Sequence, residues 1–141
     1  MIDPEQHLVL AAKHLDAGDQ LSVRGYHAWA VVAIFYLAMH MVHAGLPFVD
    51  GLTTAQQYPE SHSGRIRGQE GTTVVVTKFV PSIGKAYRSL FDASVDVRYK
   101  AEWPHREVAS NHRHADLPVV ARWACRQVHG EDHDCWLLKI E

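Results

Sequence analysis

Histidine is the residue type best suited to acid–base chemistry at neutral pH, and this sequence has 11 histidines in 141 residues. Tyr36, His40 and His43 recur at steps of four and three residues, so in a helix they share one face. Such a stripe on an apolar helix forms either a buried hydrogen-bonded network or the wall of a pocket. As a pocket wall it would stack a nucleobase, while His62 and Arg65 from the following loop would contact a phosphate.

A second group of possible ligands lies near the C-terminus. Cys125 and His129 are four residues apart and share a helical face, and His133 and Cys135 follow closely. Four such side chains could complete a tetrahedral zinc site, which would make the chain a zinc-stabilised interaction protein. The alternative is that Cys125 is a small core residue. Because no established zinc pattern has this spacing, we expect no metal and no other cofactor.

The elements that must position these side chains are predicted to be helices, because apolar residues recur at helical spacing between capping signals. Asp3 and Asp116 are the expected N-caps, and Gly45 ends the most apolar segment. The predicted helices cover residues 4–18, 21–44 and 83–100, a short stretch after Pro104, and 117–129.

Two segments between these helices are less regular. Residues 47–71 have a loop-like composition, with room for a short helix around 62–70. Residues 72–80 contain four valines and three threonines, which favours a strand. Since no other segment alternates, a strand there would have no sheet to join, and we expect a helix held by packing or an extended crossing.

The predicted fold is therefore all-α, a compact antiparallel bundle of four to five helices. It forms a single domain over residues 1–141, with 130–141 as a C-terminal tail. The apolar run at 28–39 is too short for a membrane span, so we expect a buried helix and no membrane partner. The absence of a signal-like N-terminus and the presence of only two cysteines favour the cytoplasm. The formal charge of -2 excludes a constitutively basic nucleic-acid arm but leaves room for a local basic patch.

Three stretches resemble HEPN domains (higher eukaryotes and prokaryotes nucleotide-binding). Residues 24–46, RGYHAWAVVAIFYLAMHMVHAGL, resemble the second helix of that family. Residues 61–65, SHSGR, resemble the SH…R step after its first long loop, and residues 87–99 resemble its third long helix. The resemblance covers about residues 4–128.

This resemblance implies a HEPN-like antiparallel bundle that forms a homodimer. It also implies one of two activities. The first is metal-independent RNA cleavage, as in HEPN toxins and defence nucleases. The second is non-catalytic binding of a nucleotide or pairing with a nucleotidyltransferase. The expected partners are RNA or a nucleotide, a second copy of the chain, and an antitoxin or nucleotidyltransferase.

Nucleases of the family use an arginine followed, after four to six residues, by a histidine. Four pairs fit: Arg98 with His105, Arg106 with His112, Arg122 with His129, and Arg126 with His133. We rank Arg98 and His105 first as catalytic residues, because Arg98 continues the inward stripe of its predicted helix and His105 lies at the next helix junction. The pair Arg106 and His112 ranks second.

In this hypothesis His105 moves a proton to or from the ribose and Arg98 stabilises the phosphate in the transition state. The alternative role for Arg98 is a helix C-terminal cation that bonds the last carbonyls. Tyr99 follows Arg98 where the family's nucleases favour Asn, Asp or His, which keeps the non-catalytic alternative open. The leading hypothesis is a metal-independent endoribonuclease of toxin or defence type.

Overall fold

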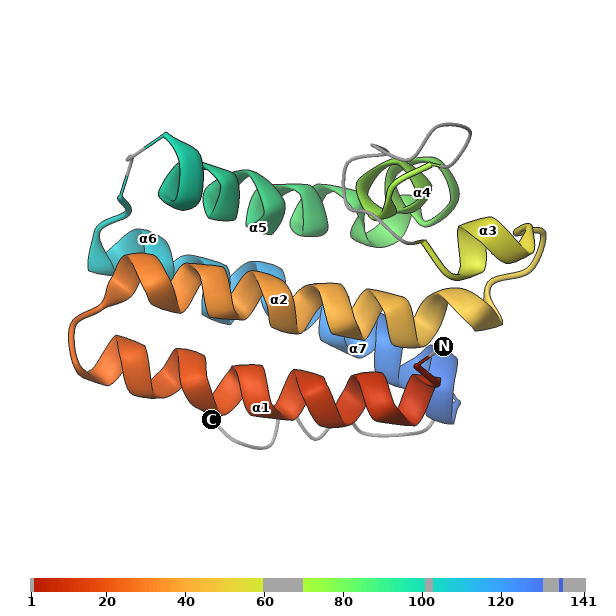
Figure 1. The fold of residues 1–141 in the computed structure, drawn as a ribbon, viewed down its shortest axis with the longest axis horizontal. Helices are drawn as coiled ribbons and strands as arrows, with labels where there is room; N and C mark the ends of the chain where they lie inside the picture. Colours follow the sequence, from red (N-terminus) through yellow and green to blue (C-terminus); the bar gives the residue numbers. More distant parts are fainter. Residues whose placement is uncertain (1, 60–69, 101–102, 131–134, 136–141) are drawn as a thin grey trace.

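The computed structural model describes residues 2–59, 70–100, 103–130 and 135, and within them the fold is all-α, with no strand. In Figure 1, α2 runs through the middle of the bundle, antiparallel to α1 and α5, and α7 lies behind it. The elements in chain order are α1 (Pro4–Val23), α2 (His27–Gly45), η1 (Leu46–Phe48), α3 (Thr54–Gln57), α4 (Thr72–Phe79), α5 (Pro81–Tyr99), α6 (Arg106–Asn111), η2 (His112–Asp116) and α7 (Leu117–His129). The described residues thus hold more helical segments than the four to five expected.

The central helix α2 supplies most of the core. Fourteen of its 19 residues are buried, because α1, α5 and α7 pack around it. The segment His27–Phe48 is long and apolar enough to cross a membrane by length and composition, and 61% of its most apolar window is buried inside the bundle. A core helix of a soluble protein has these same properties, which is how the sequence analysis interpreted it.

The boundary between α1 and α2 differs from the prediction. We expected the first helix to stop near Gly18, but α1 continues to Val23. Gly18 is buried, and a Cβ there would lie 3.4 Å from Ile34 Cγ1, so the glycine allows close approach of the two helices. The chain turns instead at Gly25, whose φ of 84° belongs to the left-handed region.

The valine-rich segment forms helix α4. Its buried residues, Thr72, Thr73, Val75 and Val76, recur at helical spacing against α5, so packing overrides the strand preference of the composition. The short helix expected around 62–70 lies outside the described residues, apart from Glu70, which is not helical.

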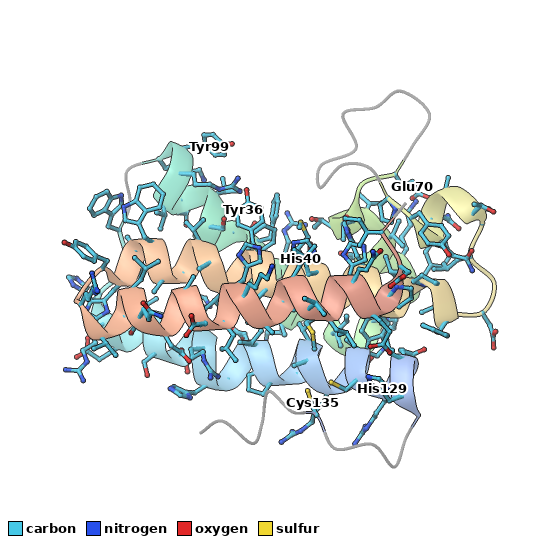
Figure 2. All side chains as sticks on the ribbon, turned by 60° about the horizontal axis from the view of Figure 1, so that its bottom comes forward. Tyr36, His40, Glu70, Tyr99, His129 and Cys135 are labelled. Atoms are coloured by element: carbon cyan, nitrogen blue, oxygen red, sulfur yellow. The ribbon has the colours of Figure 1, made fainter. Side chains whose placement is uncertain are left out.

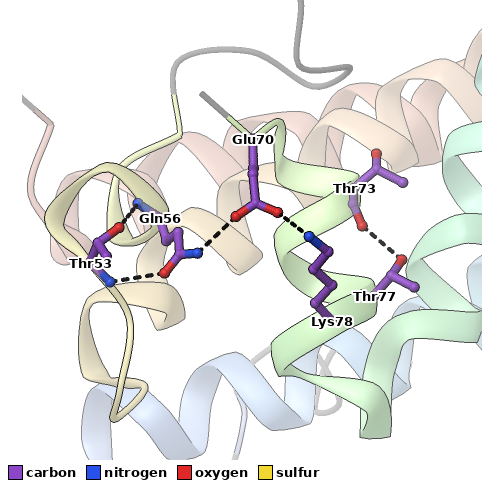
Figure 3. A network of polar contacts seen from close by, with 6 residues as sticks. All are labelled: Thr53, Gln56, Glu70, Thr73, Thr77 and Lys78. Atoms are coloured by element: carbon purple, nitrogen blue, oxygen red, sulfur yellow. Dashed lines mark hydrogen bonds and ion pairs between the residues drawn. The ribbon is translucent and has the colours of Figure 1, made fainter. Parts of the chain in front are cut away.

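A polar network joins α3 to α4 (Figure 3). Thr53 and Gln56 form a capping box at the start of α3, and the Gln56 amide donates to Glu70 Oε1 at 2.8 Å. Lys78 Nζ in α4 contacts Glu70 Oε2 at 2.7 Å. The hydrogen bond from Lys78, followed by that from Gln56, lowers the pKa of Glu70. Glu70 therefore holds the end of α3 beside α4.

The segments α6, η2 and α7 follow each other without a break, and η2 is π-helical. Asp116 immediately precedes α7, as predicted, but it has αR dihedrals and its side chain makes no capping hydrogen bond. Its Oδ2 lies 2.8 Å from His112 Nδ1 and accepts a hydrogen bond from Ser89 Oγ at 3.0 Å. Arg113, which is buried, donates to Asp19 at 3.3 Å and so links the π-helical turn to α1.

Candidate functional site

The antiparallel packing of α1 on α2 brings four histidines together. Leu8, Ala11 and Leu15 bury one face of α1, and His7 and His14 flank that face, half-buried. They are seven residues apart, so both look toward the same side of α2, where Tyr36, His40 and His43 form the predicted stripe. We call His7, His14, His40 and His43 the histidine row.

Each ring of the histidine row contacts at least one other ring of the row. His7 Nδ1 lies 3.0 Å from His40 Nδ1, and the His7 ring centroid is 5.4 Å from that of His43. The ring of His14 stacks on His40 at 5.3 Å and on Tyr36 at 6.0 Å. At one end of the row, His43 Nε2 lies 2.8 Å from Thr72 Oγ1 of α4.

Arg98 from α5 contacts the other end of this arrangement. Its Nη1 donates to the Tyr36 hydroxyl at 3.2 Å, and its guanidinium carbon lies 5.7 Å from the centroid of the Tyr36 ring. Phe35 and Tyr99 provide two further rings within 6.0 Å and 5.0 Å of that carbon. The guanidinium is therefore held among aromatic faces, a geometry that arginine favours. Figure 2 shows Tyr36 and His40 following one another along α2.

The alternative role of Arg98 as a C-terminal cation can be compared with these contacts. Arg98 Nε donates to the Ser94 carbonyl at 3.3 Å. The carbonyls without helical partners are found in the last turn of a helix. Ser94 lies five residues before the end of α5 and so outside that turn. Two of the five guanidinium N–H groups are thus used within the described residues. The other three N–H groups make no hydrogen bond to the residues that the structure describes.

Burial affects the protonation of two members of the histidine row. It lowers the pKa of both His7 and His14 below the usual imidazole value, and the Asp3 carboxylate partly opposes the shift at His7. Both rings are therefore biased toward the neutral form, in which one nitrogen donates a hydrogen bond and the other accepts one. The contact between His7 and His40 needs one ring as donor and the other as acceptor.

The predicted site residues are brought together only in part. The structure joins Arg98 to Tyr36, and Tyr36 to His40 through the stacked ring of His14. Within the described part of the chain, no hydrogen bond or ring contact joins Arg98 to His105, which is exposed immediately before α6. The predicted phosphate contacts, His62 and Arg65, lie outside the described residues.

His112, the second-ranked histidine, lies outside the histidine row. It lines an open cavity of about 530 Å³ between α5 and α6, together with Ser89, Asp92, Asp96 and Trp103. Its predicted partner Arg106 is exposed. The sequence analysis assigned no role to His7 or His14, although their seven-residue spacing on α1 is a signal that matches the stripe on α2.

No disulfide joins Cys125 to Cys135 in this structure. Cys125 and Cys135 have sulfur atoms 2.6 Å apart, whereas two thiolates on one tetrahedral zinc ion stand about 3.8 Å apart. His129 lies 3.8 Å from the Glu5 carboxylate, and His133 lies outside the described residues. No group of three or more His, Cys, Asp or Glu side chains in the described part of the chain could hold a metal ion.

Comparisons with protein-family models, with curated proteins and with solved structures find no match for this chain. The candidate site consists of a guanidinium fixed beside a tyrosine and a row of imidazoles in contact with one another.

Proposed function

We propose that the protein is a HEPN-like, metal-independent endoribonuclease that binds the RNA backbone between Arg98 and the histidine row. The observation that carries this proposal is the position of the Arg98 guanidinium beside Tyr36, whose ring stacks on His14. Arginine in this setting suits a phosphate, because its planar fork bonds two oxygens at once. The resemblance to HEPN domains supports RNA as the ligand class.

Cleavage of RNA without a metal needs a base, an acid and a cation. The ribose 2′-hydroxyl loses its proton to a neutral imidazole and attacks the adjacent phosphorus, while an imidazolium protonates the departing 5′-oxygen. His14, whose pKa is lowered by burial, would supply the neutral imidazole, and the neighbouring ring of His40 would supply the imidazolium. Arg98 would stabilise the negative charge that develops on the phosphate oxygens. His105 stays a second candidate for the acid or base.

The partners proposed with this function are those the resemblance implies. A second copy of the chain would complete a homodimer, in which two sites face one RNA. An antitoxin or a nucleotidyltransferase would control the activity in a toxin or defence system.

The test is incubation of purified protein with single-stranded and structured RNA in excess EDTA. We expect cleavage that is lost in Arg98→Ala and retained in Arg88→Ala. The second variant is a matched control because Arg88 is exposed on the same helix and forms an ion pair with Asp92, away from Tyr36. His14→Ala and His105→Ala then separate the two candidate histidines. Cleavage that persists in Arg98→Ala contradicts this site.

A second candidate function is the non-catalytic binding of a nucleotide. The observation that favours it is that Arg98 has no described contact with His105, the histidine at the family's spacing. In this case the wild-type protein cleaves no RNA, and it binds a nucleotide in an Arg98-dependent manner. Equilibrium binding of a fluorescent nucleotide to wild type, Arg98→Ala and Arg88→Ala distinguishes this outcome from cleavage.

A further inference from the structure

The chain beyond α7 returns to the helix it has just left. Gly130 follows α7 with a φ of 99°, a conformation that side-chain-bearing residues rarely adopt, so α7 ends there. Cys135 is then buried, with 4% of its surface exposed, in the same core cluster as Ala121 and Cys125. Figure 2 shows Cys135 beside α7.

The two thiols are each other's partners. The Cys125 thiol donates to Cys135 Sγ at 2.6 Å, and the Cys135 thiol lies 3.6 Å from the Ala121 carbonyl oxygen, one helical turn earlier. Both sulfurs sit on one side of α7, with no charged side chain hydrogen-bonded to either of them within the described residues. A disulfide bond is about 2.05 Å long, so two sulfurs that lie 2.6 Å apart need only a small movement to form one.

We propose that Cys125 and Cys135 form an intramolecular disulfide, which fastens the chain after α7 to the core. The co-reactant is a small-molecule disulfide of the oxidised-glutathione class. One cysteine thiolate attacks a sulfur of the oxidant and releases one glutathione thiolate, leaving a mixed disulfide. The second cysteine thiolate attacks the protein sulfur of that mixed disulfide and releases the second glutathione. The pair loses two electrons and two protons, and two glutathione thiols are formed.

The surroundings determine when this reaction is fast. The hydrogen bond with Cys135, together with burial, raises the pKa of the Cys125 thiol, so little thiolate is present in the folded protein. An oxidant also has to reach two sulfurs that are almost fully covered. Oxidation is therefore slow in the native state and fast during refolding, and the finished bond is protected from reductants.

The experiment refolds the full chain in a glutathione redox buffer and counts thiols by alkylation and mass spectrometry. We expect a monomer lighter by two hydrogen atoms, with one peptide link between Cys125 and Cys135. Loop closure of this length lowers the unfolding equilibrium constant of the oxidised protein by about 100-fold relative to the reduced protein. Cys125→Ser and Cys135→Ser serve as matched controls, since each keeps one thiol and removes the bridge.

Other products would overturn the proposal. A disulfide-linked dimer, or a stable mixed disulfide with glutathione on either residue, means that the two sulfurs do not meet in the folded chain. Two freely alkylated thiols after oxidative refolding would also show that the two sulfurs do not meet in the folded chain. Gly130→Ala provides an independent measurement, because strain at this position should slow the closing step while leaving both cysteines present.

Discussion

Arg98 Nη1 donates a hydrogen bond of 3.2 Å to the Tyr36 hydroxyl, across 62 positions of sequence. The contact joins the C-terminal end of α5 to the middle of α2 and places a guanidinium beside Tyr36, at one end of the histidine row. Because the guanidinium is held by rings and one hydroxyl, it is oriented before any ligand arrives. Such preorganisation is what phosphate recognition needs.

Arg98→Lys should weaken RNA or nucleotide binding by about 10-fold to 100-fold, because lysine keeps the charge but loses the planar fork and the stacking. Arg88→Lys, an exposed position on the same helix, should leave binding unchanged. Filter binding or fluorescence anisotropy at one fixed salt concentration measures both. Equal affinities for Arg98→Lys and wild type would mean that only charge matters at this position.

Acid should destabilise the packing of α1 on α2. The pKa values of His7 and His14 are lowered in the folded state, so the unfolded chain binds more protons than the native chain. Stability is then fully present above the unfolded imidazole value of about 6.5 and is lost as pH falls through it toward the lower folded values. Urea unfolding between pH 7.5 and about 5 should show this loss.

The variant His14→Gln should flatten that pH dependence, because it removes one of the shifted groups. His105→Gln, at an exposed position, is the matched control and should leave the slope as it is in the wild type. A steep slope that survives His14→Gln would place the responsible groups elsewhere in the bundle.

Gly45→Ala should destabilise the fold by about 1–3 kcal/mol, since overpacking a close contact forces side chains or backbone to move. A Cβ at Gly45 would stand 2.6 Å from the Trp123 ring, where α7 crosses the end of α2. At Gly84 a Cβ would meet nothing closer than 3.7 Å, so Gly84→Ala should stabilise α5 by about 0.5–1 kcal/mol. Chemical denaturation of both variants checks the difference in sign.

Tyr87→Phe should raise the free energy of unfolding by about 1 kcal/mol. The Tyr87 hydroxyl is buried beside Phe35 and has no hydrogen-bond partner in the described part of the chain, and burial raises its pKa. Removing it relieves an uncompensated desolvation cost. Tyr26→Phe, at an exposed ring, should change stability little. A loss of stability in Tyr87→Phe would indicate that the hydroxyl has a partner after all.

The sequence predicted the elements better than their contacts. The long apolar segment before Gly45 and Pro47 was recognisable as a buried helix. For residues 72–80 the lack of a partner strand left a helix or an extended crossing, and the structure has the helix. The end of the first helix was misplaced because Gly18 serves close packing against Ile34, a role that looks the same in sequence as a helix stop.

The candidate site was predictable only where its residues share one helix. Tyr36 and His40 follow from spacing along α2, whereas the contribution of His7 and His14 depends on how α1 is aligned against it. Arg98 was chosen for its inward position on α5, but the Tyr36 contact could not be derived without knowing how α5 crosses α2. Local periodicity places side chains on faces, and tertiary packing decides which faces meet.

The π-helical turn η2 also determines which changes in chain length this protein can tolerate. Buried residues recur every four positions along α6, η2 and α7, at Ala109, Arg113, Leu117, Ala121 and Cys125. In an uninterrupted α-helix such a stripe would drift by about 160° over those sixteen positions, because each step of four exceeds one turn by about 40°. The wider turn absorbs part of the excess and keeps the stripe facing α2. His112 and Arg113 are buried within this wider turn, so the number of residues it holds is coupled to the rotation of α7 about its axis and to the faces that α7 turns toward α2.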